Sequence, residues 1–134
     1  MKRIKLSQGL FALVDNEDFD WLSSYKWHIS TASKRKYAVR HVYKRIGGKK
    51  VDKLIRMHRE IMGNPKNMLV DHKNDDTLNN QKGNLRICTK SENNRNSGIR
   101  KDNRTGYKGV NYRKSHKKFR AYISTGKTFL HLGY

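Results

Sequence analysis

Four polar residues in the second half of the chain have the types and spacing needed for phosphate-ester chemistry. Asp71 and His72 are adjacent, while Asn84 and Asn93 flank the next apolar run. A carboxylate and an amide carbonyl are hard oxygen ligands that suit Mg²⁺, which keeps several waters and accepts phosphate oxygens. A neutral imidazole beside such an ion can take a proton from the water that attacks phosphorus. The set therefore predicts metal-assisted hydrolysis of a phosphodiester.

The segments around these residues predict a strand, a loop, a second strand and a helix. Residues 70–72 and 85–88 are expected to be short strands joined by the polar loop 73–84. Asp71 and His72 then lie at a strand end with side chains pointing in different directions, so they can have different roles.

A capping box marks the start of the helix that follows. Thr89 and Glu92 form the Thr-x-x-Glu pattern, and the helix is expected to run to about residue 96. Asn93 falls in its first turns, where it can face back across the two strands toward Asp71.

The rest of the chain predicts an α+β protein. Gly47-Gly48 suits a tight hairpin turn, and Gly63 can end a short helix in the left-handed conformation. The N-terminal region is predicted to hold a small mixed β-sheet, and the C-terminal segment a three-stranded antiparallel sheet. Strands are expected at residues 4–6, 10–14, 27–29, 37–44, 51–56, 109–113, 119–124 and 128–132, and helices at 18–25 and 57–62.

The central motif resembles a known nuclease motif. Val70-Asp71-His72, Asn84-Leu85-Arg86 and Asn93 resemble the HNH motif of the ββα-metal nucleases, in the form found in phage and intron-encoded homing endonucleases. Met57-His58-Arg59 resembles the segment that precedes this motif. The resemblance covers roughly residues 50–97.

This resemblance implies a role for each motif residue. His72 would be the general base, and Asp71 and Asn93 would be metal ligands. Asn84 would hold the loop and orient His72. The family often has His at the last position, and Asn there favours Mg²⁺ or Mn²⁺ over zinc. The implied activity is hydrolysis of a DNA phosphodiester by a homing-type enzyme that nicks one strand.

The C-terminal segment resembles a second family. Tyr107-Lys108-Gly109-Val110, Phe119-Arg120-Ala121-Tyr122-Ile123 and Leu132-Gly133-Tyr134 resemble the APETALA/ethylene-response-factor DNA-binding domain, which lays a three-stranded sheet in the major groove. The sequence ends before the helix that covers this sheet in the family, so either the chain is truncated or the apolar face packs elsewhere. Residues after about 100 are expected to be loosely attached. The charge of the segment predicts non-specific DNA affinity, while sequence-specific readout and a basic sheet that only improves solubility both stay open.

Several basic and polar residues are expected to contact DNA. Arg86 is equally compatible with a phosphate contact and with simply flanking the strand. The predicted contacts are Arg59, Arg86, Lys108, Asn111, Arg113, Arg120, Tyr122 and Lys127.

Composition agrees with a polyanionic partner. The 134 residues include 31 Lys and Arg against 11 Asp and Glu, a formal net charge of +20. Such a chain repels itself unless a partner neutralises it, and each phosphate contact releases counterions. Double-stranded DNA is the expected partner; a ribosome-associated or other RNA-binding protein and a non-catalytic DNA-binding regulator are the alternatives. No membrane contact is expected.

The predicted organisation has three parts. Residues 1–97 form the nuclease domain, with the ββα-metal core at about 68–97, followed by a basic linker at 98–106 and the partial DNA-binding sheet at 107–134. A monomer is expected. The single cysteine, Cys88, is expected to be a small core residue. One cysteine cannot form an internal disulfide, so the expected location is the cytoplasm of a bacterial or phage-infected cell. Trp21, Tyr25 and Trp27 are expected to form a small core rather than a base-stacking surface.

Overall fold

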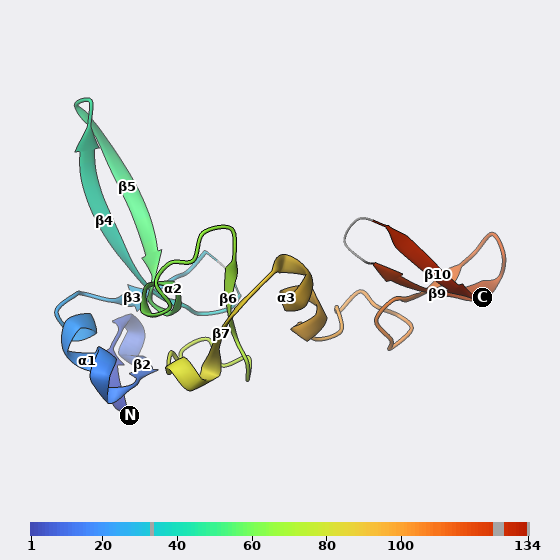
Figure 1. The fold of residues 1–134 in the computed structure, drawn as a ribbon, viewed down its shortest axis with the longest axis horizontal. Coiled ribbons are helices and arrows are strands. Elements are labelled where there is room, and N and C mark those ends of the chain that lie inside the picture. The colour runs from blue at the N-terminus through green and yellow to red at the C-terminus, as the bar shows by residue number, and fades with distance from the viewer. Residues whose placement is uncertain (33, 125–127, 134) are drawn as a thin grey trace. The chain divides into compact units, whose positions relative to one another are not determined.

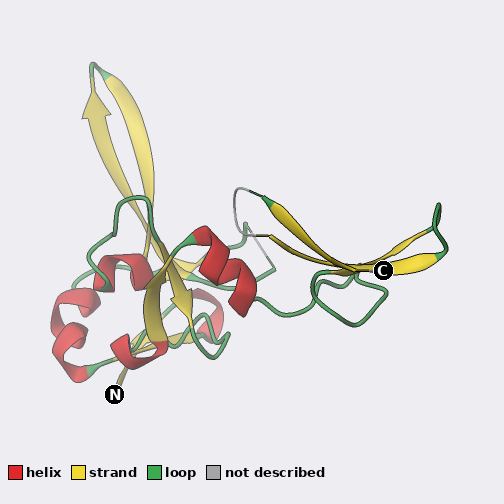
Figure 2. Ribbon diagram, turned by 45° about the vertical axis from the view of Figure 1, so that its right-hand side comes forward, coloured by secondary structure: helices red, strands yellow, loops and turns green. Residues whose placement is uncertain are grey.

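The computed structural model describes residues 1–32, 34–124 and 128–133. The chain divides into two compact units, Met1–Asn93 and Asn94–Tyr134 (Figure 1). Both combine strands with short helical segments or turns, and all four sheets of the described residues are small and antiparallel (Figure 2). The structure is therefore mixed α and β, as the sequence predicts.

The first unit begins with a two-stranded sheet and a helix. Strand β1 (Lys2–Lys5) pairs with β2 (Phe11–Val14), and the 3₁₀ turn η1 (Ser7–Gly9) joins them. Helix α1 (Asn16–Ser23) follows, with Glu17 and Asp18 in its first turn, where acidic groups favour the helix dipole. A single mixed sheet was predicted here, and that prediction is wrong. Two separate antiparallel sheets form instead, and the parallel pairing is an isolated bridge between Leu13 and Asn79.

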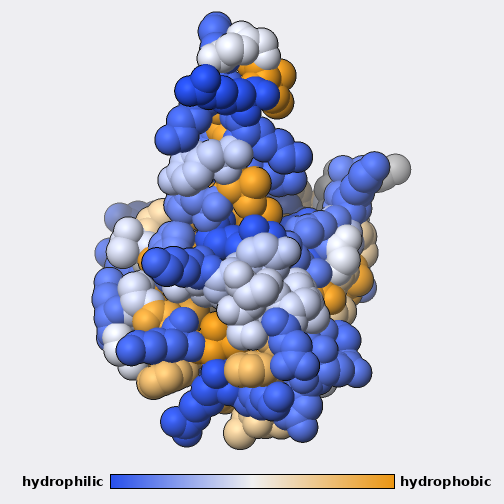
Figure 3. All heavy atoms as spheres, turned by 90° about the vertical axis from the view of Figure 1, so that its left-hand side faces the viewer, coloured by the Kyte–Doolittle hydropathy of each residue, from blue (hydrophilic) through white to orange (hydrophobic). Residues whose placement is uncertain are grey.

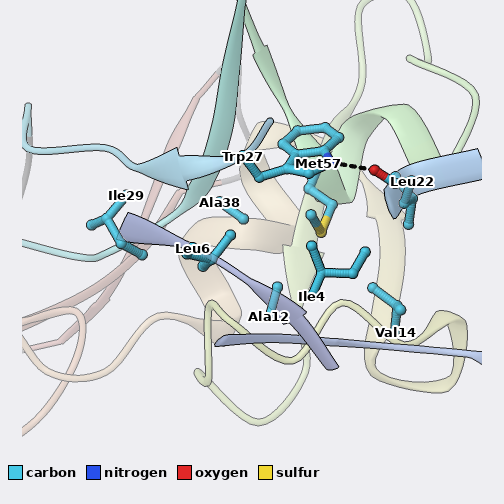
Figure 4. Packing of buried hydrophobic residues seen from close by; sticks show 9 residues of the cluster. All are labelled: Ile4, Leu6, Ala12, Val14, Leu22, Trp27, Ile29, Ala38 and Met57. Carbon is cyan, nitrogen blue, oxygen red and sulfur yellow. Dashed lines mark hydrogen bonds between the residues drawn. The ribbon is translucent and has the colours of Figure 1, made fainter. Parts of the chain in front are cut away.

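The core of this unit lies between the first sheet, α1 and the start of α2. Trp27 belongs to it and donates its indole N–H to the Leu22 carbonyl at 2.8 Å (Figure 4). Trp21 and Tyr25 are exposed, so only Trp27 of the three predicted aromatic residues is a core residue. Each fully buried side chain such as Leu22 or Met57 contributes roughly 1.5–3 kcal/mol. The cluster comprises Ile4, Leu6, Ala12, Val14, Leu22, Trp27, Ile29, Ala38 and Met57.

A long hairpin projects from this core. Strand β3 (His28–Ile29) pairs with β4 (Ala38–Ile46), which pairs with β5 (Lys49–Arg56). Gly47 and Gly48 have φ of 57° and 77°, which confirms the predicted glycine turn. Helix α2 (Met57–Ile61) follows directly and is closed by Gly63.

The strand, strand and helix predicted for the central motif are present. Strand β6 (Leu69–His72) pairs with β7 (Leu85–Cys88), the 3₁₀ turn η2 (Lys82–Asn84) precedes β7, and α3 (Lys90–Asn96) follows it. The capping box is confirmed: Thr89 N–H donates to the Glu92 carboxylate at 2.7 Å, and Glu92 N–H donates to Thr89 Oγ1 at 3.2 Å. Cys88 is buried, as expected.

The second unit is the predicted three-stranded sheet. It contains β8 (Val110–Arg113), β9 (Lys118–Ser124) and β10 (Phe129–Gly133), in the order β10-β9-β8. The strand register pairs Val110 with Ala121 and Ile123 with Leu130, which places the apolar residues on one face as the alternation predicts. No helix in the described part of the chain is long and apolar enough to span a membrane.

Gly109 is the position where the second unit is most sensitive to substitution. Its φ is +73°, and an added Cβ would lie 2.5 Å from the backbone oxygen of Tyr122. The neighbouring Gly106 has φ of +75° but open space around it. We expect Gly109→Ala to destabilise the β8–β9 pairing by about 2 kcal/mol or more, and Gly106→Ala by only about 1 kcal/mol.

Amide hydrogen exchange checks this expectation, because Tyr122 N–H donates to the Gly109 carbonyl at 2.8 Å. Protection of that amide should fall much further in Gly109→Ala than in Gly106→Ala. Equal loss in the two variants would show that backbone strain alone, and not the close approach to Tyr122, sets the cost.

Candidate functional site

A polar pocket of about 250 Å³ lies where α2, β6 and α3 meet the segment before β4. It brings together three of the four predicted catalytic and metal-binding residues, Asp71, His72 and Asn93. Three arginines and one carboxylate line it, so its surface favours an anion such as a phosphate. The lining residues are Arg35, Tyr37, Arg56, His58, Arg59, Leu69, Val70, Asp71, His72 and Asn93.

The His72 imidazole has a defined hydrogen-bond partner. Its Nε2 lies 3.1 Å from Oδ1 of Asn80. The Asn80 amide nitrogen donates to the Leu78 carbonyl at 3.3 Å, and a carbonyl can only accept, so Oδ1 is the atom turned to the imidazole. His72 therefore carries its proton on Nε2 when neutral, and the lone pair is on Nδ1. This is the tautomer that can act as a base through Nδ1.

Asn80 is held by a long-range contact that the sequence does not reveal. Its N–H donates to the Leu13 carbonyl at 2.8 Å, and Leu13 N–H donates to the Leu78 carbonyl at 2.9 Å. Asp15 adds to this attachment by accepting from the Gln81 side chain at 3.0 Å and from Lys82 N–H at 2.8 Å. The loop between β6 and β7 is thus fastened to the end of β2, and Asn80 is 1% exposed.

Aromatic rings fix the His72 ring on its other sides. The His58 ring meets it edge-on with centroids 4.9 Å apart, and Tyr37 lies 6.1 Å from His72 and 5.4 Å from His58. His72 is 3% exposed and His58 is 5% exposed. Burial lowers the pKa of His72, although the hydrogen bond that His72 donates to Asn80 and the charge of Asp71 oppose this. His72 is consequently neutral near pH 7.

His58 is also held neutral. Burial lowers its pKa to about 3, and the proximity of His72, Arg56 and Arg59 adds to the effect. Its Nδ1 is buried and has no hydrogen-bond partner. A buried polar atom without a partner lowers the stability of the folded protein, so the packing of the His58 ring must compensate for this loss.

Asp71 is oriented by the neighbouring strand. It pairs in register with Arg86, whose Nη2 and Nε donate to Asp71 Oδ2 at 2.9 and 3.3 Å. From the sequence, Arg86 is equally compatible with a phosphate contact and with a position that only flanks the strand. Its guanidinium donates to Asp71, which agrees with a role within the sheet. A carboxylate that is itself hydrogen-bonded is held in one direction, as metal-binding carboxylates commonly are.

The donor set fits a hard divalent cation better than zinc. Asp71 and Asn93 both line the pocket and could offer a carboxylate and an amide oxygen, and the rest of an octahedron would be water and phosphate. In the described residues, no group of three His, Cys, Asp or Glu side chains could hold a metal. Because three arginines also line the pocket, a cation would bind with the help of a substrate phosphate.

Asn84 lies beside this site but does not bond to the His72 side chain. Its side chain donates to the Asn79 carbonyl at 2.9 Å and accepts from Asn74 N–H at 3.2 Å, and its carbonyl accepts from Lys73 N–H at 2.8 Å. Asn84 therefore spans the two ends of the loop, as the resemblance implies, while the hydrogen bond that orients the His72 imidazole is made by Asn80. A buried Asn within a polar loop carries no sequence signal that distinguishes it from a turn residue.

The residues predicted to contact DNA have different environments. Arg59 donates to the carbonyls of Pro65 and Met68 at 2.7 and 3.0 Å, which is a structural use, although it also lines the pocket. Lys108 donates to the carbonyls of Arg95 and Ser97. Arg113 is exposed at the end of β8. Lys127 lies outside the described residues.

Asn111, Arg120 and Tyr122 are on the polar face of the second unit. Asn111 pairs in register with Arg120, and both Asn111 Oδ1 and Arg120 Nε are buried without a hydrogen-bond partner. Arg120 also lies over the Tyr122 ring, 5.2 Å from its centroid. These unpaired atoms make the polar face the better candidate for a ligand surface in this unit.

The central segment of the chain is similar to a known protein family. Residues 62–95 match the family model of the HNH endonucleases. This HNH segment contains Asp71, His72, Asn80, Asn84 and Asn93, and it supports nuclease activity on DNA. No curated protein and no solved structure matches the chain.

Proposed function

We propose that the protein is a metal-dependent DNA endonuclease whose active site is the pocket around Asp71, His72 and Asn93. The observation that carries this proposal is that these three side chains, all from the HNH segment, lie in one arginine-lined pocket. A pocket with one acidic and three cationic side chains favours the phosphate of a nucleic-acid backbone over a cationic or apolar substrate.

Each residue has a distinct role in this proposal. His72 Nδ1 takes a proton from the attacking water, because Asn80 holds the proton on Nε2. Asp71 and Asn93 would hold Mg²⁺ or Mn²⁺, which supplies stabilisation of the charge on the departing 3′-oxygen. Arg86 orients the Asp71 carboxylate. Arg35, Arg56 and Arg59 attract the phosphate.

The products follow from this arrangement. Attack by water on phosphorus with departure of the 3′-oxygen leaves 5′-phosphate and 3′-hydroxyl ends. One pocket per chain cuts one strand, so a monomer of the homing type would nick duplex DNA. The second unit, with its similarity to the APETALA/ethylene-response-factor domain, is proposed to add DNA affinity in the cytoplasm of a bacterial or phage-infected cell.

Supercoiled plasmid provides the direct test. With Mg²⁺ we expect conversion to the open-circular form, and with EDTA we expect no conversion. Plasmid binding is measured in the same EDTA samples by mobility shift. Binding in EDTA without any nicking when Mg²⁺ or Mn²⁺ is added would overturn the proposal and indicate a DNA-binding regulator instead.

A further inference from the structure

The outer part of the β4–β5 hairpin has no packing role in the first unit. Every residue from Tyr43 to Leu54 is exposed, and Tyr43 itself is 58% exposed. The hairpin projects away from the core of its unit (Figure 1). A two-stranded hairpin without a covered face is marginally stable in water. A contribution to the stability of the first unit therefore does not explain why the chain forms this arm.

The arm is strongly basic. Between Ala38 and Arg56 one side chain is acidic, Asp52, and it pairs with His41 at 2.8 Å. Arg40, at the base, pairs with Glu60 at 2.6 Å. Figure 3 shows the arm with a mostly hydrophilic surface. The cationic residues beyond the base are Lys44, Arg45, Lys49, Lys50 and Lys53, and Arg56 lies at the base opposite Val39.

One face of the arm also presents aromatic rings. Tyr43 stacks on His41 with centroids 6.0 Å apart and planes 13° apart, and His41 stacks on His28 at 5.2 Å. Lys50 Nζ lies 4.2 Å above the Tyr43 ring. These contacts gather aromatic and cationic side chains along the two strands of the arm.

A basic groove joins the arm to the candidate active site. It has a volume of about 540 Å³, and Lys53, Arg56, Arg59 and Lys66 line it together with uncharged residues only. Arg56 and Arg59 also line the pocket that contains His72. The cationic surface is therefore continuous from the hairpin to the proposed site of chemistry within one unit.

The dimensions of the arm suit a DNA groove. A strand rises about 3.3 Å per residue, so the four residues from Tyr43 to Ile46 extend roughly 13 Å. The major groove of B-DNA is about 8.5 Å deep and wide enough for a two-stranded ribbon, whereas that of A-form RNA is too narrow.

We propose that the β4–β5 hairpin is a DNA-binding arm whose tip enters the major groove while the groove at its base holds the adjacent backbone phosphates. The proposal rests on the proposed function only in taking duplex DNA as the ligand. The arm is tested by measuring DNA binding in EDTA, where no cleavage is measured. Failure of the arm proposal therefore does not imply failure of the proposed nuclease activity, and the reverse also holds.

Charge removal at the tip is the first test. The variant combining Lys44→Gln, Lys49→Gln and Lys50→Gln is compared with a control combining Lys2→Gln, Lys5→Gln and Lys26→Gln, which are exposed lysines of the same unit outside both pockets. Binding of the full chain to a short duplex is measured against salt concentration. The tip variant should bind roughly 10- to 100-fold more weakly, with a salt dependence smaller by about 2–3 ions, and the control should change by less than one ion.

Occlusion of the major groove is the second test. A duplex with glucosylated 5-hydroxymethylcytosine carries sugars in that groove, and it should weaken binding of the unmodified chain much more than binding of the tip variant. Equal weakening of both proteins, or equal loss of duplex RNA and duplex DNA binding in the tip variant, would overturn the proposal.

A crosslink supports these measurements without removing charge. Cys88 is buried and is the one cysteine of the sequence, so Ile46→Cys introduces a single exposed thiol at the tip. A photoreactive group on that thiol should crosslink to bases of the duplex. Absence of crosslinks from this position, with binding intact, would show that the arm lies away from DNA.

Discussion

His72→Ala is expected to lower the rate of plasmid nicking by about 10²- to 10⁴-fold, the range that a positioned general base contributes. The imidazole is neutral near pH 7 because burial lowers its pKa, and Asn80 fixes the proton on Nε2. Removing the side chain therefore removes the proton acceptor without removing a charge. Duplex affinity in EDTA should stay within about threefold.

The matched control for this prediction is His116→Ala. His116 is exposed in the second unit and lies outside the proposed pocket, so its rate should equal that of the unmodified protein. Retention of more than a tenth of the activity in His72→Ala would show that another group accepts the proton.

Asn80→Ala separates positioning from chemistry. Without the Asn80 amide, His72 is free to adopt the other tautomer and to rotate, and we expect kcat to fall about 10- to 100-fold with little change in KM. The tautomer is visible in the ¹⁵N NMR shifts of His72, which should move from a protonated Nε2 toward a mixture. A fall in activity with the same ¹⁵N shifts and a lower unfolding midpoint would assign Asn80 a structural role alone.

The sequence predicts the local parts of this site well because the signals are local. The Thr89–Glu92 capping box, the Gly47-Gly48 turn and the alternation across β8 and β9 act over a few residues, and the structure confirms each of them. Such signals depend on backbone geometry and side-chain type within one element, which is the information that a single sequence contains.

The contacts that complete the site depend on distant parts of the chain and were not predicted. Asn80 reaches His72 because the loop that carries it is bonded to Leu13 and Asp15. The burial of His58 against His72 follows from the packing of α2 on β4 and β5. The sequence likewise predicts two ordinary strands for β4 and β5, since periodicity does not show whether a strand is covered.

The buried His58 predicts a specific loss of stability in acid. The pKa of His58 is about 3 in the folded protein and about 6.5 in the unfolded chain, so above pH 6.5 neither state binds a proton at this residue. As the pH falls below 6.5, the unfolded state takes up a proton that the folded state does not. The free energy of unfolding should then fall by about 1.4 kcal/mol per pH unit, and the loss should end near pH 3.

Urea unfolding of the first unit measures this effect, because both tryptophans, Trp21 and Trp27, belong to residues 1–93 and report on that unit alone. Between pH 6 and pH 4.5 the unmodified protein should lose about 2 kcal/mol more than His58→Gln, since the variant has no imidazole to protonate at this position. His116→Gln, which removes an exposed imidazole, should show the same pH dependence as the unmodified protein. Parallel curves for the unmodified protein and His58→Gln would mean that His58 accepts a proton in the folded state, and that the pocket admits water to Nδ1 despite its burial.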